Sequence, residues 1–275
     1  MDAISGKTKV LGLIGQPVAH SLSPAIHNTF AKTLGQDTAY MVFDVAPNSL
    51  KAAICGAHAL GISGLNFTYP HKTHAAKMAI TLDSLATQAA AVNTLKHTPR
   101  GYVGYNTDVF GVERALIGHN VIPNSATIMG AGAAATAAAI ACARLGASHL
   151  TIINRTKKNT KTLASRLKMY YNVDIAICEA RDSGVLQHCG DVFIVATAFD
   201  ASVTLPAQGE YGAILNMNYH GNAPLNNTAK VVISGIEVLV HQAAAAYEIF
   251  CDNAVAIPRE IVNEIINSLQ LTGGK

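Results

Sequence analysis

Apolar and polar positions alternate with two periods along the 275 residues of the chain. Short apolar runs bounded by Gly, Pro or Asn predict buried strands, and longer amphipathic stretches between them predict helices. This alternation is typical of an α/β fold with parallel sheets. Strands are predicted over residues 10–14, 40–45, 65–68, 91–96, 101–105, 126–129, 150–153, 192–196, 213–217 and 231–234. Helices are predicted over residues 23–34, 48–60, 107–117, 133–145, 157–170, 238–250 and 258–269, with a further helix near Lys72.

A break in this pattern at Gly118-His119-Asn120 separates two series of elements. The alternation starts again at Ala126, and no low-complexity linker lies between the two series. A chain of this length can form two ordinary domains. The break therefore predicts a domain boundary without a flexible tether.

Composition narrows the class of protein. Half of the residues are hydrophobic, 13% are charged and the net charge is +3, which provides a large core but no general surface for nucleic acid or an anionic membrane. The cysteines are widely spaced without a Cys-x-x-Cys pair, and no His-x-x-x-His pair occurs, so no metal site is expected. The polar N-terminus and short alanine-rich stretches predict neither signal peptide nor membrane span, and hence a cytoplasmic protein.

The segment from Gly64 to Lys72, Gly-Leu-Asn-Phe-Thr-Tyr-Pro-His-Lys, carries the most specific chemistry. Asn66 and Thr68 are two positions apart, so they face the same side of a predicted strand. Pro70 ends the strand and suits the first turn of a helix, which puts the lysine in or near that turn. The helix macrodipole is positive there, so this lysine is expected to release its proton readily, as a proton donor in catalysis must. An exposed surface lysine beside a turn is the alternative.

A glycine-rich turn follows the strand predicted at residues 126–129. Residues 130–135 read Gly-Ala-Gly-Ala-Ala-Ala and open an alanine-rich helix. Gly130 permits a tight turn, Gly132 lets the backbone approach a pyrophosphate, and Ala135 allows close packing of helix on strand. The N–H groups at the start of the helix can then bind phosphates. An ordinary helix-entry turn is the alternative, but the flanking strand and helix favour a dinucleotide site.

The next predicted strand ends in Asn154-Arg155-Thr156-Lys157-Lys158 and carries no acid there. An Asp or Glu at this place binds the ribose 2′-hydroxyl of NAD and would repel the 2′-phosphate of NADP. Arg155 can pair with that phosphate, and Lys157 or Lys158 can add positive charge. A basic surface loop is the alternative, but the position after the glycine turn favours NADP.

Further polar residues stand at the ends of predicted elements. They are Ser21, Ser23, Asn93, Thr94, Asn106, Thr107, Asp108 and Gln242. Each has a simpler explanation when taken singly, because serines suit turns and caps, an aspartate suits the first turn of a helix, and a glutamine suits an exposed helix face. Their joint occurrence is what indicates a polar site.

In this order along the chain, these segments resemble the shikimate dehydrogenase family. Residues 21–24, Ser-Leu-Ser-Pro, resemble its Ser-x-Ser-Pro motif, and residues 66–72 resemble its Asn-Val-Thr-x-Pro-x-Lys motif. Residues 91–94 and 104–108 match two more motifs, residues 154–156 resemble the NADP-selecting turn, and Gln242 stands at the position of a substrate glutamine. The resemblance covers nearly the whole chain.

The resemblance implies reversible, NADP-linked reduction of 3-dehydroshikimate to shikimate, in aromatic amino acid biosynthesis. It implies that Lys72 and Asp108 form the catalytic pair. The substrate-binding residues would be Ser21, Ser23, Asn66, Thr68, Lys72, Asn93, Asp108, Tyr219 and Gln242. The cofactor-binding residues would be Gly130, Ala131, Gly132, Ala133, Ala134, Asn154, Arg155, Thr156, Lys158, Thr197 and Gly235.

The resemblance also implies two α/β domains. A substrate-binding and catalytic domain would comprise residues 1–107 and 250–275, because the last helix returns to it. A doubly wound, Rossmann-type NADP-binding domain would comprise residues 108–249. The protein is expected as a monomer or homodimer.

Departures from the family pattern concentrate in the second domain. Ala133 replaces the last glycine of the usual turn, Val195 replaces an asparagine, Gly221 a proline and Val238 a methionine. Two alternatives therefore stay open, namely a quinate/shikimate dehydrogenase with broader substrate or NAD use, and a non-catalytic shikimate-binding protein. Retention of both Lys72 and Asp108 argues against the second.

Overall fold

The computed structural model describes residues 4–179, 190–197, 211–218 and 229–272. The chain forms two compact units, Met1–Thr107 with Leu239–Lys275, and Asp108–Val238. The C-terminal part of the first unit starts at Leu239, whereas the sequence placed this start at 250. The reason is packing of the helix α8 (Gly235–Phe250), whose later turns contact first-unit residues such as His27.

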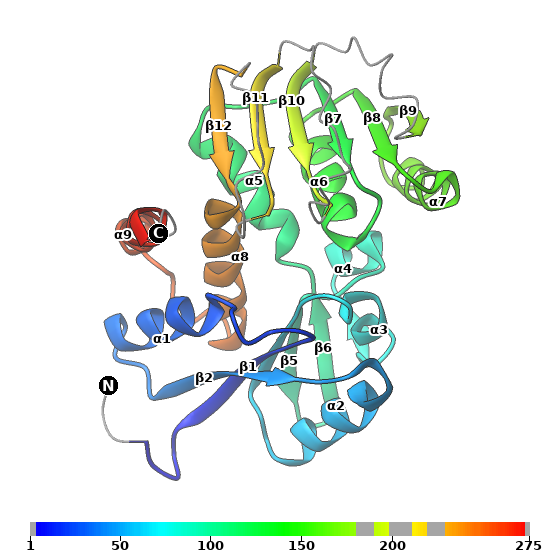
Figure 1. Ribbon diagram of the computed structural model, residues 1–275. Coiled ribbons are helices and arrows are strands. Elements are labelled where there is room, and N and C mark those ends of the chain that lie inside the picture. Colours follow the sequence, from blue (N-terminus) through cyan, green and yellow to red (C-terminus); the bar gives the residue numbers. More distant parts are fainter. Residues whose placement is uncertain (1–3, 180–189, 198–210, 219–228, 273–275) are drawn as a thin grey trace. The chain divides into compact units, whose positions relative to one another are not determined.

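The first unit alternates strands and helices in chain order (Figure 1). Its strands are β1 (Lys9–Gly15), β2 (Thr38–Asp44), β3 (Gly64–Phe67), β4 (Thr81–Leu82), β5 (Thr94–Thr98) and β6 (Gly101–Tyr105). Its helices are α1 (Ser23–Thr33), the short 3-10 helix η1 (Pro47–Ser49), α2 (Leu50–Ala59), α3 (Lys72–Ala76), α4 (Ser84–Ala89), the later turns of α8, and α9 (Arg259–Thr272).

The sheet of this unit has the order β2-β1-β3-β5-β6-β4. β1 pairs in parallel with β2 and β3, and β4 pairs in parallel with β6. β5 is antiparallel to both β3 and β6, so the sheet is mixed rather than wholly parallel. The tight connection between β5 and β6 makes these two strands antiparallel, because it reverses the chain where a helical crossover would have kept its direction.

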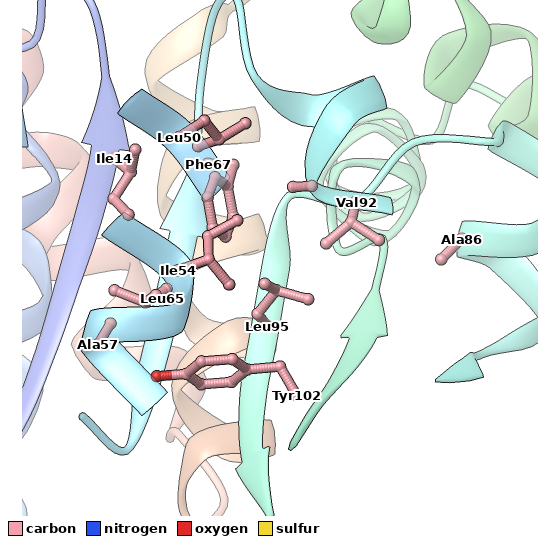
Figure 2. Packing of buried hydrophobic residues seen from close by; sticks show 11 residues of the cluster. Ile14, Leu50, Ile54, Ala57, Leu65, Phe67, Ala86, Val92, Leu95 and Tyr102 are labelled. Carbon is pink, nitrogen blue, oxygen red and sulfur yellow. The ribbon is translucent and has the colours of Figure 1, made fainter. Parts of the chain in front are cut away.

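Alternation along β3 divides its side chains between two layers. Leu65 and Phe67 point to the apolar side chains of α2, among them Leu50 and Ile54 (Figure 2). Gly64 and Asn66, which alternate with them, face the opposite layer. There the ring of Phe250 lies over Gly64, where an added Cβ would come within 2.2 Å of that ring. A glycine at this position therefore permits α8 to pack on the sheet.

The second unit is a doubly wound parallel α/β layer structure (Figure 1). Its strands are β7 (Ser125–Met129), β8 (His149–Asn154), β9 (Asp174–Glu179), β10 (Gly190–Val195), β11 (Tyr211–Asn216) and β12 (Val231–Ser234). Its helices are α5 (Asp108–Gly118), α6 (Ala133–Arg144), α7 (Lys157–Lys168) and the start of α8. All its strand pairs are parallel, in the order β12-β11-β10-β7-β8-β9. This is the strand order of a dinucleotide-binding Rossmann fold, as the sequence predicted.

Candidate active site

One edge of the first-unit sheet gathers the polar motifs that the sequence singled out. β1 and β3 are parallel, so the residues after both strands lie at the same edge. The antiparallel register pairs Asn66 with Thr94 and Thr94 with Tyr105, which brings the start of β5 and the end of β6 to that edge as well. Four segments far apart in sequence thus meet where β3 ends.

Asn66 on β3 holds this edge together from within. Its side chain is 5% exposed, and its Oδ1 accepts a hydrogen bond from the Tyr40 hydroxyl at 2.8 Å. Its Nδ2 donates to the Asn93 carbonyl oxygen at 3.1 Å and to Thr94 Oγ1 at 2.9 Å. These internal bonds fix the orientation of the Asn66 amide. A contact between this amide and the substrate stays a prediction.

Asn93 connects β5 to the segment after β6 and to α8. Its Nδ2 donates to Thr107 Oγ1 at 2.8 Å and to Gln242 Oε1 at 3.1 Å, and its Oδ1 accepts from the Thr107 backbone N–H at 2.8 Å. Thr107 Oγ1 also donates to Gln242 Oε1 at 3.3 Å. Asn93 and Gln242, which are far apart in the chain, therefore belong to one hydrogen-bonded cluster within the first unit.

The two serines of the Ser-x-Ser-Pro motif lie between β1 and α1. α1 begins at Ser23 with a proline in its first turn, as the sequence predicted. At the start of the helix, the Ser23 backbone N–H donates a hydrogen bond to Ser21 Oγ at 3.2 Å. The acceptor there is thus Ser21 Oγ and not the Ser23 hydroxyl. Ser23 is 5% exposed. Its hydroxyl is thus held at the helix entry without acting as the cap.

Thr68 and Lys72 follow β3 directly. Thr68 N–H donates to the Ile14 carbonyl at 3.0 Å, and its methyl group occupies the space above Gly15, where an added Cβ would lie 2.3 Å away. His71, buried at 1% exposure, hydrogen-bonds the Val45 carbonyl at 2.7 Å through Nε2. Lys72 is the first residue of α3 and is half-buried, which confirms its predicted place in a first helical turn.

Asp108 begins α5, in the first turn where an acid is favourable. Its side chain is 7% exposed. The preceding residue, Thr107, is fully buried and bonded to Asn93 through both its backbone N–H and its hydroxyl. Lys72 is tied to the same region, because its carbonyl oxygen accepts from the Val92 N–H at 2.9 Å.

The predicted nucleotide turn lies between β7 and α6. Gly130 has φ +124°, and a Cβ there would stand 2.8 Å from the Ala196 carbonyl oxygen after β10. Glycine is therefore required where the ends of β7 and β10 approach each other. These two strands flank the point at which the strand order reverses, where such sheets bind their ligands.

The start of α6 fits a pyrophosphate. Gly132 is its N-cap, is exposed, and has no atom within 4 Å of an added Cβ. No side chain caps the helix there, so its first N–H groups remain available to an anion. Ala131, Ala133 and Ala134 are half-buried beside it. The replacement of the usual glycine by Ala133 thus places only a methyl group within the first helical turn.

The basic segment after β8 lies on the surface of the second unit. Asn154 ends the strand and donates through Nδ2 to the Thr156 carbonyl at 3.2 Å. Arg155, Thr156 and Lys158 are exposed, and Thr156 is the N-cap of α7. The strand ends without an acid, so the segment fits a 2′-phosphate.

Thr197 and Gly235 follow β10 and β12 at the same edge. The Thr197 carbonyl accepts from Asn218 Nδ2 at 2.6 Å. Gly235 opens α8 against the end of β11, where an added Cβ would stand 2.6 Å from the Asn216 carbonyl oxygen. This close approach explains the glycine. Tyr219 and Gly221, which the sequence also singled out, lie outside the described residues.

The described ranges hold neither a grouped set of metal ligands nor a membrane-spanning helix. No group of three or more His, Cys, Asp or Glu side chains there is arranged to hold a metal ion. Among the helices that the structure describes, none combines the length and apolar character needed to cross a membrane.

Two residues that support the cluster, Tyr40 and His27, were not predicted from the sequence. Tyr40 on β2 is 3% exposed, and the fully buried ring of His27 stacks on it with centroids 4.1 Å apart at 7°. Burial lowers the pKa of His27 to about 3. Neither residue belongs to a recognised polar motif, and both were counted only as parts of a predicted element. The indication in the sequence was that a polar ring, that of His27, interrupts the otherwise apolar stripe of the helix predicted at residues 23–34.

Comparisons with known proteins agree with this architecture. Residues 13–95 match the family model described as the shikimate dehydrogenase substrate binding domain, and residues 115–209 match that of shikimate / quinate 5-dehydrogenase. A shikimate dehydrogenase (NADP+) of Methanopyrus kandleri is 34% identical over 283 residues, covering 96% of this chain and 97% of the relative.

Solved structures extend the likeness to the whole fold. Shikimate 5-dehydrogenase from Listeria monocytogenes, in complex with shikimate and NAD, has a TM-score of 0.83 at 27% identity and covers 97% of this chain and 99% of its own. A shikimate dehydrogenase in complex with NADP+ has a TM-score of 0.81 at 32% identity, covering 97% of each chain. On the family models and these relatives together, the chain belongs to the shikimate dehydrogenase family.

Proposed function

We propose that this protein is an NADP-dependent shikimate dehydrogenase that reversibly reduces 3-dehydroshikimate to shikimate, a step of aromatic amino acid biosynthesis. The observation that carries the proposal is the hydrogen-bonded cluster of Asn66, Asn93, Thr107 and Gln242 at one edge of the first-unit sheet. It joins three family motifs and the distant glutamine into one buried polar cluster, of which Gln242 is partly exposed. Polar groups held in fixed positions beside an exposed amide suit a small acid that carries several hydroxyl groups.

Lys72 and Asp108 are the proposed catalytic pair. When bound, the reduced cofactor supplies the hydride for the ketone carbon. The Lys72 ammonium stabilises the negative charge that develops on the ketone oxygen and delivers a proton to it. Asp108 orients the ammonium group and a substrate hydroxyl. No metal or covalent intermediate is part of this mechanism.

The remaining assignments put most substrate contacts on the first unit, with Asp108 and Tyr219 from the second, and the cofactor contacts on the second unit. Substrate carboxylate and hydroxyl groups would contact the side chains Ser21, Ser23, Asn66, Thr68, Lys72, Asn93, Asp108, Tyr219 and Gln242. The cofactor pyrophosphate would bind at residues 130–134, and its 2′-phosphate at residues 154–156 and Lys158. Thr197 and Gly235 would line the nicotinamide side. The exposed, uncapped start of α6 and the exposed Arg155 support these assignments.

Assembly and location are part of the proposal. The net charge of +3 and the low fraction of charged residues, 13%, support a small-molecule enzyme rather than a nucleic-acid-binding protein. We assign the protein to the cytoplasm, as a monomer or a homodimer. Light scattering of the purified chain decides between the two assemblies.

A steady-state assay that crosses shikimate and quinate with NADP+ and NAD+ tests the function. We expect reduction of the cofactor with shikimate and NADP+, and much lower kcat/KM in the other three combinations. Comparable activity with quinate or NAD+ would favour the broader quinate/shikimate dehydrogenase. Shikimate binding without activity in any combination would instead identify a binding protein.

A further inference from the structure

Three side-chain amides at the proposed substrate edge each bond a backbone group that can only donate or only accept a hydrogen bond. Asn66 Nδ2 lies 3.1 Å from the Asn93 carbonyl oxygen, and Gln242 Nε2 lies 2.9 Å from the Leu239 carbonyl oxygen. Asn93 Oδ1 lies 2.8 Å from the Thr107 backbone nitrogen. A carbonyl only accepts and a backbone N–H only donates, so the orientation of each amide is determined.

Given these orientations, the hydrogen bonds run in one direction from β2 to α8. The Tyr40 hydroxyl must donate to Asn66 Oδ1, at 2.8 Å. Asn66 Nδ2 then donates a hydrogen bond to Thr94 Oγ1 at 2.9 Å. The Thr94 hydroxyl in turn donates a hydrogen bond to Asn93 Oδ1 at 3.1 Å. Asn93 Nδ2 finally donates to Gln242 Oε1 at 3.1 Å.

The far end of this series determines what Gln242 can offer a ligand. Its Oε1 already accepts from Asn93 Nδ2 and from Thr107 Oγ1. One N–H of its Nε2 bonds Leu239, and the other bonds no group in the part of the chain that the structure describes. The residue is half-buried. Gln242 therefore presents a donor, and not an acceptor, to an approaching ligand.

Asn93 has a different part in the same series. Its two N–H groups bond Thr107 and Gln242, and its Oδ1 accepts from the Thr107 backbone and from Thr94. Both the oxygen and the nitrogen of this amide are thus engaged within the cluster. Asn93 is suited to transmit orientation to Gln242.

We propose that Tyr40 and Thr94 are positioning residues for Gln242, which they hold with one N–H directed at an acceptor oxygen of the substrate. The inference rests on the proposed function, because the substrate is taken to be shikimate. Neither residue touches the ligand in this account, and both act through Asn66 and Asn93.

Burial makes the Tyr40 hydroxyl hard to replace. Tyr40 is 3% exposed and its ring is held by the stacked ring of His27, so water cannot readily take the place of the hydroxyl. Without it, Asn66 Oδ1 is buried with no donor, which is costly. Turning the amide to relieve this would break its bonds to Asn93 and Thr94.

The test compares Tyr40→Phe with Tyr102→Phe. Tyr102 is a matched control, since it is 2% exposed, lies in the same unit, and donates its own buried hydrogen bond to the Ile62 carbonyl at 2.8 Å. We expect Tyr40→Phe to raise the KM for shikimate about tenfold with the KM for NADP+ unchanged. The control should lose similar thermal stability with both KM values unchanged. Thr94→Val should repeat the Tyr40→Phe effect, and Thr94→Ser should restore the wild-type KM.

A second readout does not depend on activity. In uniformly ¹⁵N-labelled, ligand-free protein, the side-chain amide resonances of Gln242, assigned with Gln242→Glu, should shift in Tyr40→Phe and stay in place in Tyr102→Phe. Equal KM changes in the two tyrosine variants, or Gln242 resonances that do not move, would overturn the positioning role. Absence of shikimate turnover in the wild-type protein would refute the proposed function alone, and the amide resonances would still decide the positioning role.

Discussion

The proposed substrate edge of the first unit and the proposed nucleotide edge of the second are built on opposite principles. In the first, buried side chains such as Asn66, Asn93 and Thr107 are bonded to each other before any ligand arrives. In the second, the ligand groups are backbone N–H donors at an exposed helix start and exposed cations such as Arg155. The first edge is a pre-formed network of buried hydrogen bonds, and the second relies on exposed charges and N–H groups. Comparable substitutions at the two edges should therefore differ in their effects on stability and on ligand affinity.

The largest expected effect is on turnover. Lys72→Ala should lower kcat on the order of 10²–10⁴-fold with only a modest rise in the KM for shikimate, because the variant loses proton transfer and keeps the cluster. Lys77→Ala is the matched control, since Lys77 lies exposed at the other end of α3. Steady-state kinetics decides, and an unchanged kcat in Lys72→Ala would refute the assigned proton transfer.

Removal of one side-chain amide should lower the free energy of unfolding more at the substrate edge than at the nucleotide edge. Asn66→Ala should lower the free energy of unfolding by about 3 kcal/mol, since Tyr40 and the Asn93 carbonyl lose their partner in a buried place. Asn154→Ala removes a single exposed contact and should cost at most about 0.5 kcal/mol. Urea denaturation of both variants tests this contrast. Equal losses would mean that the substrate edge is no more preorganised than the nucleotide edge.

A charge removed from the nucleotide edge should change selectivity instead. Arg155→Ala should weaken NADP+ binding roughly 10–100-fold and NAD+ binding far less, because only NADP+ carries the 2′-phosphate. Arg114→Ala, an exposed arginine on α5 of the same unit, serves as the control. Calorimetric titration with each cofactor measures both affinities. Equal losses for the two cofactors in Arg155→Ala would remove the 2′-phosphate role.

A different kind of effect, which appears only below pH 6.5, is the acid sensitivity that His27 gives to the first unit. The pKa of buried His27 is about 3, below its ordinary value of 6.5, so the unfolded chain binds this proton first as pH falls. The unfolding free energy then falls by about 1.4 kcal/mol per pH unit between these two values. His27→Phe should remove this part of the slope, whereas His74→Phe, at an exposed position, should leave it. Unfolding curves at pH 7 and pH 5 provide the comparison, and an unchanged slope in His27→Phe would contradict it.

Much of the fold follows from local sequence. Long amphipathic helices and apolar strands were predicted close to their observed bounds, because burial of one face dictates their periodicity. β4, α4 and β9 were missed. β4 is two residues long, α4 is a short alanine-rich helix held by the Asp83 side chain on the Ala86 N–H, and β9 is a half-exposed edge strand. Such elements depend on tertiary contacts more than on pattern.

The site was predictable only as far as motifs reach. The motif residues were found because their polar types recur at element ends in a familiar order. Tyr40 and the pinned orientation of Gln242 were not, because they follow from strand register and from contacts between residues more than a hundred positions apart. The predicted strand at 91–96 begins only at Thr94, since the backbone of Val92 and Asn93 is used to bind Lys72 and Tyr105.

The most direct measurement is the stoichiometry and product of one reaction. Purified protein is incubated with 3-dehydroshikimate and NADPH, NADPH consumption is followed by absorbance, and the product is identified by NMR. We expect one NADPH to be oxidised for each shikimate formed. Binding of 3-dehydroshikimate without NADPH consumption, or formation of a different product, would contradict it.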